Sequence, residues 1–126
     1  KVMHGDQIVI NGDGTITRDF THVDDVVQTL FLALQANVTH PTPVNLAFGL
    51  PVSLLEIVDE LRVHFSNVAP VFGPNRTGDI QHSQNDPRLL LELFPSLAPR
   101  EFSEGFAATV EWLRRQGEKV ANRPIH

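Results

Sequence analysis

The sequence predicts a small α/β unit with an α+β-like arrangement, in which a β-hairpin and short strands combine with four helices. Three observations predict this fold class. Short β-rich runs at 7–10 and 15–18 are separated by Asn-Gly and Asp-Gly dipeptides. Apolar residues then recur at helical spacing from Asp24 onwards. Strand-like and helix-like segments alternate along the rest of the chain, without an internal repeat or a second domain.

The first elements are predicted to be a hairpin followed by a helix. Asn-Gly and Asp-Gly accept the positive φ angles of tight turns, so the two β-rich runs are expected to pair with each other. Asp24 is the predicted N-cap of the helix, with Asp25 in its first turn and an end near Asn37. Its apolar residues repeat every three or four positions: Val26, Val27, Leu30, Phe31 and Leu34.

The middle of the chain predicts two short strands around a second helix. Residues 44–48 are typical of a buried strand, and residues 71–72 of a short one. Between them, Ser53 and Glu56 form a capping box that starts a helix. One face of that helix is apolar through Leu54, Ile57, Val58, Leu61 and Phe65.

Two further helices are predicted near the end of the chain. Asp86 is the expected N-cap of the first, with Pro87 at its first position and an end near Phe94. Ser103 is expected to open the last helix, whose core-facing residues are Phe106, Val110 and Leu113. We therefore expect residues 1–117 to form one unit and residues 118–126 to be a polar tail.

Composition narrows the classes of partner. The chain has 126 residues, 41% of them hydrophobic, and a net charge of −5 that argues against nucleic acid. No apolar stretch approaches the ~20 residues of a membrane helix, so we expect no membrane partner and a cytoplasmic location. Cysteine is absent, which excludes disulfides and thiolate chemistry, and the six histidines show no metal-binding spacing. A small anion is the more natural ligand.

Arg18 is the most informative single residue. In a regular strand it shares a face with Ile16 and Phe20, so its guanidinium leaves from an apolar surface and needs an anionic partner. One alternative is an internal ion pair with a nearby carboxylate: Asp19, Asp24 or Asp25. The other alternative is a ligand phosphate, which suits the planar fork of arginine.

A second candidate lies in the Gly73–Asp79 segment, which has two glycines and one proline and is predicted to be a surface loop. Arg76 and Asp79 lie three residues apart in it, with Gly78 between them. Such a turn can point a guanidinium at a phosphate and a carboxylate at two adjacent hydroxyls. An ordinary solvated turn explains the same pattern.

Several short motifs follow one another along the chain: Gly12-Asp13-Gly14, Arg18-Asp19-Phe20, Val23-Asp24-Asp25, Arg76-Thr77-Gly78-Asp79 and Glu104-Gly105-Phe106. In this order they resemble the extended short-chain dehydrogenase/reductase family of NAD-dependent epimerases and dehydratases, of which UDP-glucose 4-epimerase is a member. The resemblance runs from about Gly5 to Arg114 and is to the C-terminal part of a Rossmann-type enzyme. It implies that residues 1–117 are a nucleotide-sugar-binding lobe.

The resemblance also implies roles for particular residues. Arg18 and Arg76 would hold the diphosphate of a nucleoside-diphosphate sugar, most simply a UDP-sugar, and Asp79 would hold the ribose. The strand from Val9 to Asn11 would offer backbone groups to the edge of the base. The implied activity is interconversion of UDP-glucose and UDP-galactose, with dehydratase, decarboxylase or reductase chemistry as alternatives.

Departures from the family limit what this chain does alone. It contains no tyrosine, so the Tyr-x-x-x-Lys pair that performs the family's chemistry is absent, and its eight glycines never form the Gly-x-x-Gly-x-x-Gly turn that binds NAD. We therefore expect NAD only in an intact enzyme with a separate N-terminal NAD-binding domain, and an isolated chain that is inactive. A stand-alone, non-catalytic nucleotide-binding module is the alternative from a different class.

Overall fold

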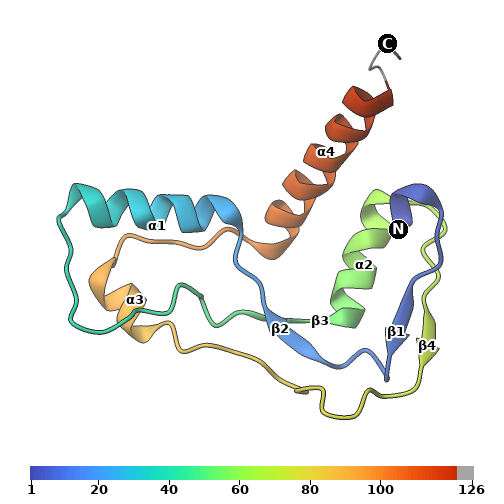
Figure 1. Ribbon diagram of the computed structural model, residues 1–126, viewed down its shortest axis with the longest axis horizontal. Helices are drawn as coiled ribbons and strands as arrows, with labels where there is room; N and C mark the ends of the chain where they lie inside the picture. Colours follow the sequence, from blue (N-terminus) through green and yellow to red (C-terminus); the bar gives the residue numbers. More distant parts are fainter. Residues whose placement is uncertain (122–126) are drawn as a thin grey trace.

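The computed structural model describes residues 1–121 and has the mixed α/β architecture that the sequence predicts (Figure 1). Helices α1 and α3 lie at one end of the molecule, and helix α2 lies beside strands β1 and β4 at the other. The elements are a 3₁₀ turn at Val2–His4, β1 (Val9–Asn11), β2 (Thr17–Asp19), α1 (Val23–Gln35), β3 (Pro51–Ser53), α2 (Leu54–His64), β4 (Val71–Gly73), α3 (Arg88–Leu93) and α4 (Phe102–Ala121).

The predicted hairpin is wrong, since β1 and β2 do not pair with each other. Strand β1 pairs in parallel with β4, in the register Val9 to Val71, and β2 pairs antiparallel with β3. Gly12 has the positive φ expected of a turn residue, at 82°, but its N–H donates to the carbonyl of Gly73 at 3.0 Å. The turn residues change the direction of the chain here, but they do not determine which strand β1 pairs with. Contacts between residues distant in sequence determine that.

The start of α1 also differs from the prediction. Its N-cap is His22, whose ring Nδ1 accepts a hydrogen bond from the Asp24 N–H at 3.2 Å. Asp24 instead pairs with the Arg100 guanidinium at 2.9 Å, and the buried carboxylate of Asp25 accepts from the Arg100 N–H at 3.3 Å. These carboxylates therefore tie α1 to the segment before α4, which is why neither of them is the cap.

The predicted strand at 44–48 is also wrong, since these residues form no ladder although Ala47 and Phe48 are buried. The capping box of α2 is confirmed, with Ser53 Oγ accepting from the Glu56 N–H at 3.2 Å.

The two later helices start close to their predicted positions. Helix α3 begins one residue late, at Arg88, whose N–H donates to Asp86 Oδ1 at 3.0 Å. Helix α4 begins one residue early, at Phe102, and continues to Ala121, past the end expected at Gly117. The rest of the predicted polar tail, 122–126, lies outside the described residues.

Two packed clusters hold the unit together. Phe48, Leu90, Phe94 and Leu97 form a buried core, against which one side of α1 packs. A second cluster joins the residue after β2 to the start of α4, where the ring centroids of Phe20 and Phe102 lie 5.4 Å apart. On α4, Val110 is buried as predicted, but Leu113 is 42% exposed, so its predicted core position is wrong. Among residues 1–121, no helix has both the length and the apolarity that crossing a membrane requires.

Candidate functional site

The segment after β4 is attached along β2, and this attachment builds the site. The Thr17 N–H donates to the carbonyl of Gln81 at 2.9 Å, and the Ser83 N–H donates to the carbonyl of Thr17 at 3.3 Å. Further on, the Asn85 N–H donates to Asp19 Oδ2 at 3.2 Å. Figure 1 shows this segment passing from β4 along the edge of the molecule towards α3. Residues 79–80, far from β2 in sequence, therefore lie next to it.

A cavity of about 270 Å³ lies between β1, β2 and this segment. Four of the five residues that the sequence predicts as ligand contacts line it: Val9, Asn11, Arg18 and Asp79. The remaining wall is apolar and comes from Ile8, Ile10, Ile16 and Leu54. The structure therefore brings most of the predicted site together, even though the predicted pairing of the strands is wrong.

Arg18 is held by backbone carbonyls. Its Nη1 donates to the carbonyl of Thr17 at 2.7 Å and to that of Ile80 at 2.8 Å. The alternative of an internal ion pair with Asp19, Asp24 or Asp25 is wrong, because no carboxylate of residues 1–117 lies within 4.0 Å of this guanidinium. Arginine has five donors, so three remain, on Nε and Nη2, in the geometry that holds phosphate or carboxylate in a bidentate way.

Strand β1 presents an unpaired edge to the same cavity. The Val71 N–H donates to the carbonyl of Ile8 and the Gly12 N–H to that of Gly73, so alternate residues of β1 face β4. The backbone groups of Val9 and Asn11 point the other way, and Figure 1 shows β2 on that side. The edge therefore offers a donor, an acceptor and a donor in order: Val9 N–H, Val9 C=O and Asn11 N–H.

The loop that carries Arg76 and Asp79 is a turn, as predicted. The Asp79 N–H donates to the carbonyl of Arg76 at 3.3 Å, and Gly78 has a φ of 87°. Both side chains are exposed, but only Asp79 lines the cavity, and Arg76 does not. The loop also rests on Gly12, where a Cβ would lie 2.2 Å from Asn75 Oδ1. That amide is the end of a flexible side chain and could move away, so it is the φ of 82° at Gly12 that favours glycine there.

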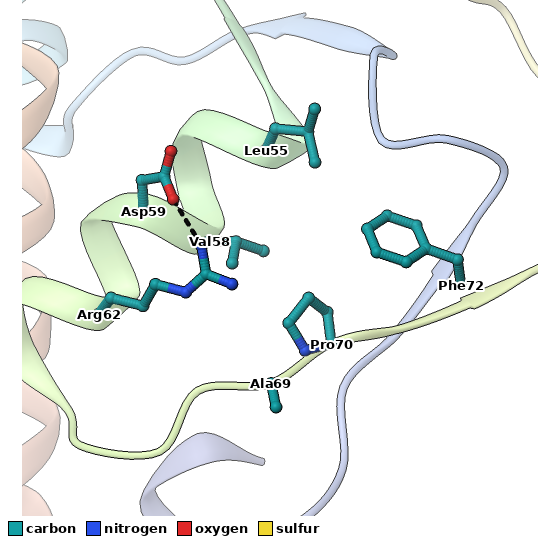
Figure 2. Close-up of a pocket in the computed structure, with 7 residues that line it drawn as sticks. All are labelled: Leu55, Val58, Asp59, Arg62, Ala69, Pro70 and Phe72. Atoms are coloured by element: carbon teal, nitrogen blue, oxygen red, sulfur yellow. Dashed lines mark hydrogen bonds and ion pairs between the residues drawn. The ribbon is translucent and has the colours of Figure 1, made fainter.

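A larger hollow of about 380 Å³ between α2 and β4 differs from this cavity in chemistry. Figure 2 shows its Arg62 directed at Asp59, with Pro70 and Phe72 across the hollow. The Arg62 Nη1 donates to Asp59 Oδ1 at 2.7 Å, and its Nε donates to the carbonyl of Val68 at 3.3 Å. Since its guanidinium is already neutralised, this hollow is the poorer anion site. Among the described residues, no cluster of His, Asp or Glu could hold a metal ion.

The first part of the chain, which contributes β1, β2 and Arg18, is similar to a known family of enzymes. Residues 1–47 match the NAD dependent epimerase/dehydratase family. Beyond this match, UDP-glucuronic acid decarboxylase 1 of Danio rerio is 29% identical over 97% of this chain, which spans 29% of that protein. The homologues are thus UDP-sugar enzymes.

Solved structures extend the similarity to the whole fold. UDP-glucose 4-epimerase from Thermotoga maritima, with UDP-glucose, matches 91% of this chain with 29% identity and a TM-score of 0.79. MoeE5, in complex with UDP-glucuronic acid and NAD, matches 90% with 34% identity and a TM-score of 0.74. The chain spans only 37% and 38% of these two proteins.

Sequence reasoning missed the residues that shape the cavity without binding through a charge. The carbonyl of Ile80 orients Arg18, and the side chain of Leu54 closes one wall. Neither has a recognisable motif, since a backbone carbonyl carries no sequence signature and leucine is common. The pairing of residues 81–83 with β2 reveals the first role, and the hydrogen bond from the Leu54 N–H to the carbonyl of Ile16, at 3.1 Å, reveals the second.

Proposed function

We propose that this chain binds the UDP part of a nucleotide sugar and is the substrate-binding region of an NAD-dependent epimerase or dehydratase. One observation carries the proposal. The Arg18 guanidinium, with three free donors and no carboxylate partner in the described chain, lines one cavity together with the Asp79 carboxylate and the open edge of β1. A diphosphate, a ribose diol and a base edge need these three kinds of group.

The order of groups on β1 favours uracil over cytosine. Uracil presents acceptor, donor and acceptor along its O4, N3–H and O2 edge, which complements the donor, acceptor and donor of Val9 and Asn11. Cytosine has an acceptor at N3, which would face the carbonyl of Val9. A buried acceptor without a donor costs about 1 to 3 kcal/mol. We therefore expect UDP to bind more tightly than CDP.

Arg18 and Asp79 take the roles that this ligand requires. The Nε and Nη2 donors of Arg18 would hold a phosphate, and the Asp79 carboxylate would accept from the two ribose hydroxyls. Arg76 would reach the diphosphate from the loop, which requires its exposed side chain to turn towards the cavity when the ligand binds. These contacts orient the sugar and leave the chemistry to other groups.

The described residues do not fit NAD. In the fold that binds dinucleotides, a strand leads through a glycine-rich turn into a helix, whereas β1 leads through Gly12-Asp13-Gly14 into β2. The chain also has no tyrosine for proton transfer. We therefore assign the cofactor and the catalytic base to the part of the relatives that this chain does not span, and expect the chain alone to be inactive.

The specific reaction that we propose first is 4-epimerisation of a UDP-hexose, because of the similarity to the Thermotoga maritima enzyme. Decarboxylation of a UDP-uronic acid is the second candidate, and the Danio rerio relative, which aligns with 97% of this chain, favours it. The two differ in what happens to the sugar, and Arg18, Asp79 and β1 contact only the nucleotide.

An NMR titration of the ¹⁵N-labelled chain with UDP, CDP and inorganic pyrophosphate tests the proposal. With one wall of the site missing, we expect UDP to bind with a Kd of about 1 mM. Its shifts should be centred on residues 9–11 and 79–81, and CDP should bind several-fold more weakly. Equal affinity for UDP and pyrophosphate would remove the assignment of the base, and absence of shifts at residues 9–11 would remove the site.

A further inference from the structure

The Asn11-Gly12 dipeptide has a chemical reactivity that neither the fold nor the site uses. The sequence predicts a hairpin turn there, but Asn11 lies in the ladder between β1 and β4, opposite Gly73 (Figure 1). An asparagine that precedes a glycine is prone to deamidation, because glycine has no Cβ to hinder attack by its own backbone nitrogen. Asn11 is the one asparagine of the chain that precedes a glycine.

Deamidation converts the side-chain amide to a carboxylate in two steps. The Gly12 backbone nitrogen loses its proton to hydroxide and attacks Asn11 Cγ. The Cγ–Nδ2 bond then breaks, and ammonia leaves with a proton from water, which closes a succinimide ring. Water opens the ring at Cγ to give aspartate, or at the main-chain carbonyl carbon to give isoaspartate, whose backbone runs through the side-chain carbons. The net change is loss of ammonia and gain of water, without an oxidant or a reductant.

The structure keeps the attacking nitrogen out of this reaction. The Gly12 N–H donates to the carbonyl of Gly73 at 3.0 Å, and Asn11 Oδ1 lies across the ladder, 3.4 Å from the position of a Cβ on Gly73. Ring closure also requires rotation about the Cα–C bond of Asn11, out of the extended conformation of a strand. Both the hydrogen bond and that conformation must be lost first, so β1 and β4 have to separate locally.

Asp13-Gly14, which follows directly, could form the same ring from a carboxyl group. The Thr15 hydroxyl donates to Asp13 Oδ1 at 2.6 Å and the Thr15 N–H donates to it at 2.9 Å, and these hydrogen bonds lower the pKa of Asp13. An ionised carboxylate is a poor target for a nucleophile. We therefore expect the reaction at Asn11 and not at Asp13.

Asn11 also lies in the nucleotide site. It lines the Arg18 cavity together with the Asp79 carboxylate, and its N–H is the second donor of the β1 edge. Either product adds a carboxylate to a cavity that we assign to a diphosphate, and like charges repel. Isoaspartate also adds a methylene to the backbone of β1, which disturbs the pairing of residue 11 with Gly73.

We propose that Asn11 is a deamidation site that the pairing of β1 with β4 keeps closed, and that the reaction inactivates the nucleotide site. The chain then loses its ligand through the opening of one short ladder, without cleavage and without unfolding of the remaining elements. The inactivation rests on the proposed binding of UDP, whereas the protection by the ladder does not.

Peptide mapping by mass spectrometry measures the reaction at residue 11. The chain is kept at mildly alkaline pH, folded in one sample and unfolded in guanidinium chloride in the other. We expect isoaspartate, with the mass increase of deamidation, to form at least about 10-fold more slowly in the folded chain. Isomerisation of Asp13 would leave the mass unchanged, so the two reactions are distinguished.

Two variants sharpen this measurement. Val71→Pro removes the N–H that donates to the Ile8 carbonyl at 2.9 Å, which weakens the ladder and should accelerate deamidation in buffer. Asn11→Gln lengthens the side chain by a methylene, which disfavours ring closure, and should show no reaction at this position. Equal rates in the folded and unfolded samples, or no isoaspartate at residue 11 even when unfolded, would overturn the proposal. This comparison does not require the Val71 variant to fold.

NMR titration with UDP tests the consequence for the site. The deamidated protein carries an added negative charge, so ion exchange separates it from the unmodified chain. We expect it to bind UDP at least about 10-fold more weakly. Asn11→Asp introduces the charge without the added methylene and should cause a smaller loss. Unchanged UDP affinity of the deamidated protein would overturn the proposed inactivation.

The proposed function and the protection of Asn11 can fail separately. Arg18→Ala should abolish UDP binding and leave the rate of deamidation unchanged, because Arg18 is not part of the ladder between β1 and β4. If the unmodified chain did not bind UDP, the proposed function and the inactivation would both be lost. The rates in the folded and unfolded samples would still decide whether the ladder protects Asn11.

Discussion

Two hollows of this protein each contain one arginine, and the arginines are held differently. Arg62 donates to the Asp59 carboxylate, three residues earlier on the same helix. Arg18 donates to two carbonyls, one of which comes from a segment more than sixty positions away. A carboxylate neutralises a guanidinium, whereas carbonyls orient it and leave its charge in place. The smaller cavity therefore keeps a positive charge for a ligand, and the larger hollow does not.

In this fold the size of a hollow is a poor guide to its function. The α2 hollow has about 380 Å³ against about 270 Å³ for the Arg18 cavity. The smaller one combines a free guanidinium fork, a carboxylate and a strand edge, and these convergent polar groups are what distinguish a binding site from a gap between elements.

Removal of the two arginines should give opposite results. Loss of Arg18 removes charge-assisted hydrogen bonds of about 1.5 to 3 kcal/mol, which weakens UDP binding about 10- to 100-fold. Arg62→Ala is the matched control and should leave the UDP affinity unchanged. NMR titration of both variants measures this. If the two variants weakened UDP binding equally, the distinction between the hollows would be lost.

Asp79 should have a smaller effect that depends on the ribose. Asp79→Asn exchanges a charged acceptor for an amide, and we expect UDP to bind about 5-fold more weakly, equivalent to about 1 kcal/mol. The same substitution should have no effect with 2′,3′-dideoxyuridine diphosphate, which lacks both hydroxyls. An equal loss for both ligands would show that Asp79 acts through the fold and not through the diol.

The ion pair of the α2 hollow should matter little for stability. The side chains of Arg62 and Asp59 are 52% and 71% exposed, and exposed pairs contribute about 0.2 to 1 kcal/mol. We expect Asp59→Asn to lower the free energy of unfolding by less than about 1 kcal/mol in a urea titration. A larger loss of stability would contradict this expectation and would mean that the pair organises α2.

The smallest expected effect is the pH dependence of the α2 capping box. The Ser53 hydroxyl and N–H donate to the Glu56 carboxylate, and these hydrogen bonds lower its pKa from 4.5. A lowered pKa means that the contribution is present above pH 4.5 and is lost as the pH falls through the value in the folded state. Stability measured from pH 6 to pH 3 should therefore decrease, and Glu56→Gln should remove that part of the decrease. An unchanged profile in this variant would contradict the assignment.

The predictions from sequence succeed where the interaction is local. The capping box of α2 needs only Ser53 and Glu56, three residues apart, and it forms as predicted. The pairing of β1 fails because its partner β4 lies sixty residues away, and no local signal distinguishes β4 from β2. The predicted cap at Asp24 fails for the same reason, since Arg100 attracts that carboxylate from a distant segment.

The site follows the same division. Arg18 could be identified from its apolar neighbours, since a strand places alternate residues on one face. Its partner could not, and the internal ion pair that the spacing favoured is absent because Asp19 accepts hydrogen bonds from Gly49 and Asn85 instead. The segment 44–48 fails as a strand for a different reason. A strand needs a neighbour, and residues 1–121 provide none.

The Nη1 atom of Arg18 holds the carbonyls of Thr17 and Ile80 together. A phosphate on the same guanidinium would orient it further, so ligand binding and attachment of the segment that carries Asp79 become thermodynamically linked. Linkage is reciprocal. Nucleotide binding stabilises the attachment of residues 79–83, and loss of that attachment lowers the affinity for the nucleotide by the same factor. We expect UDP to slow amide exchange at Thr17 and Ser83, whose N–H groups donate across this attachment, although neither residue lines the cavity.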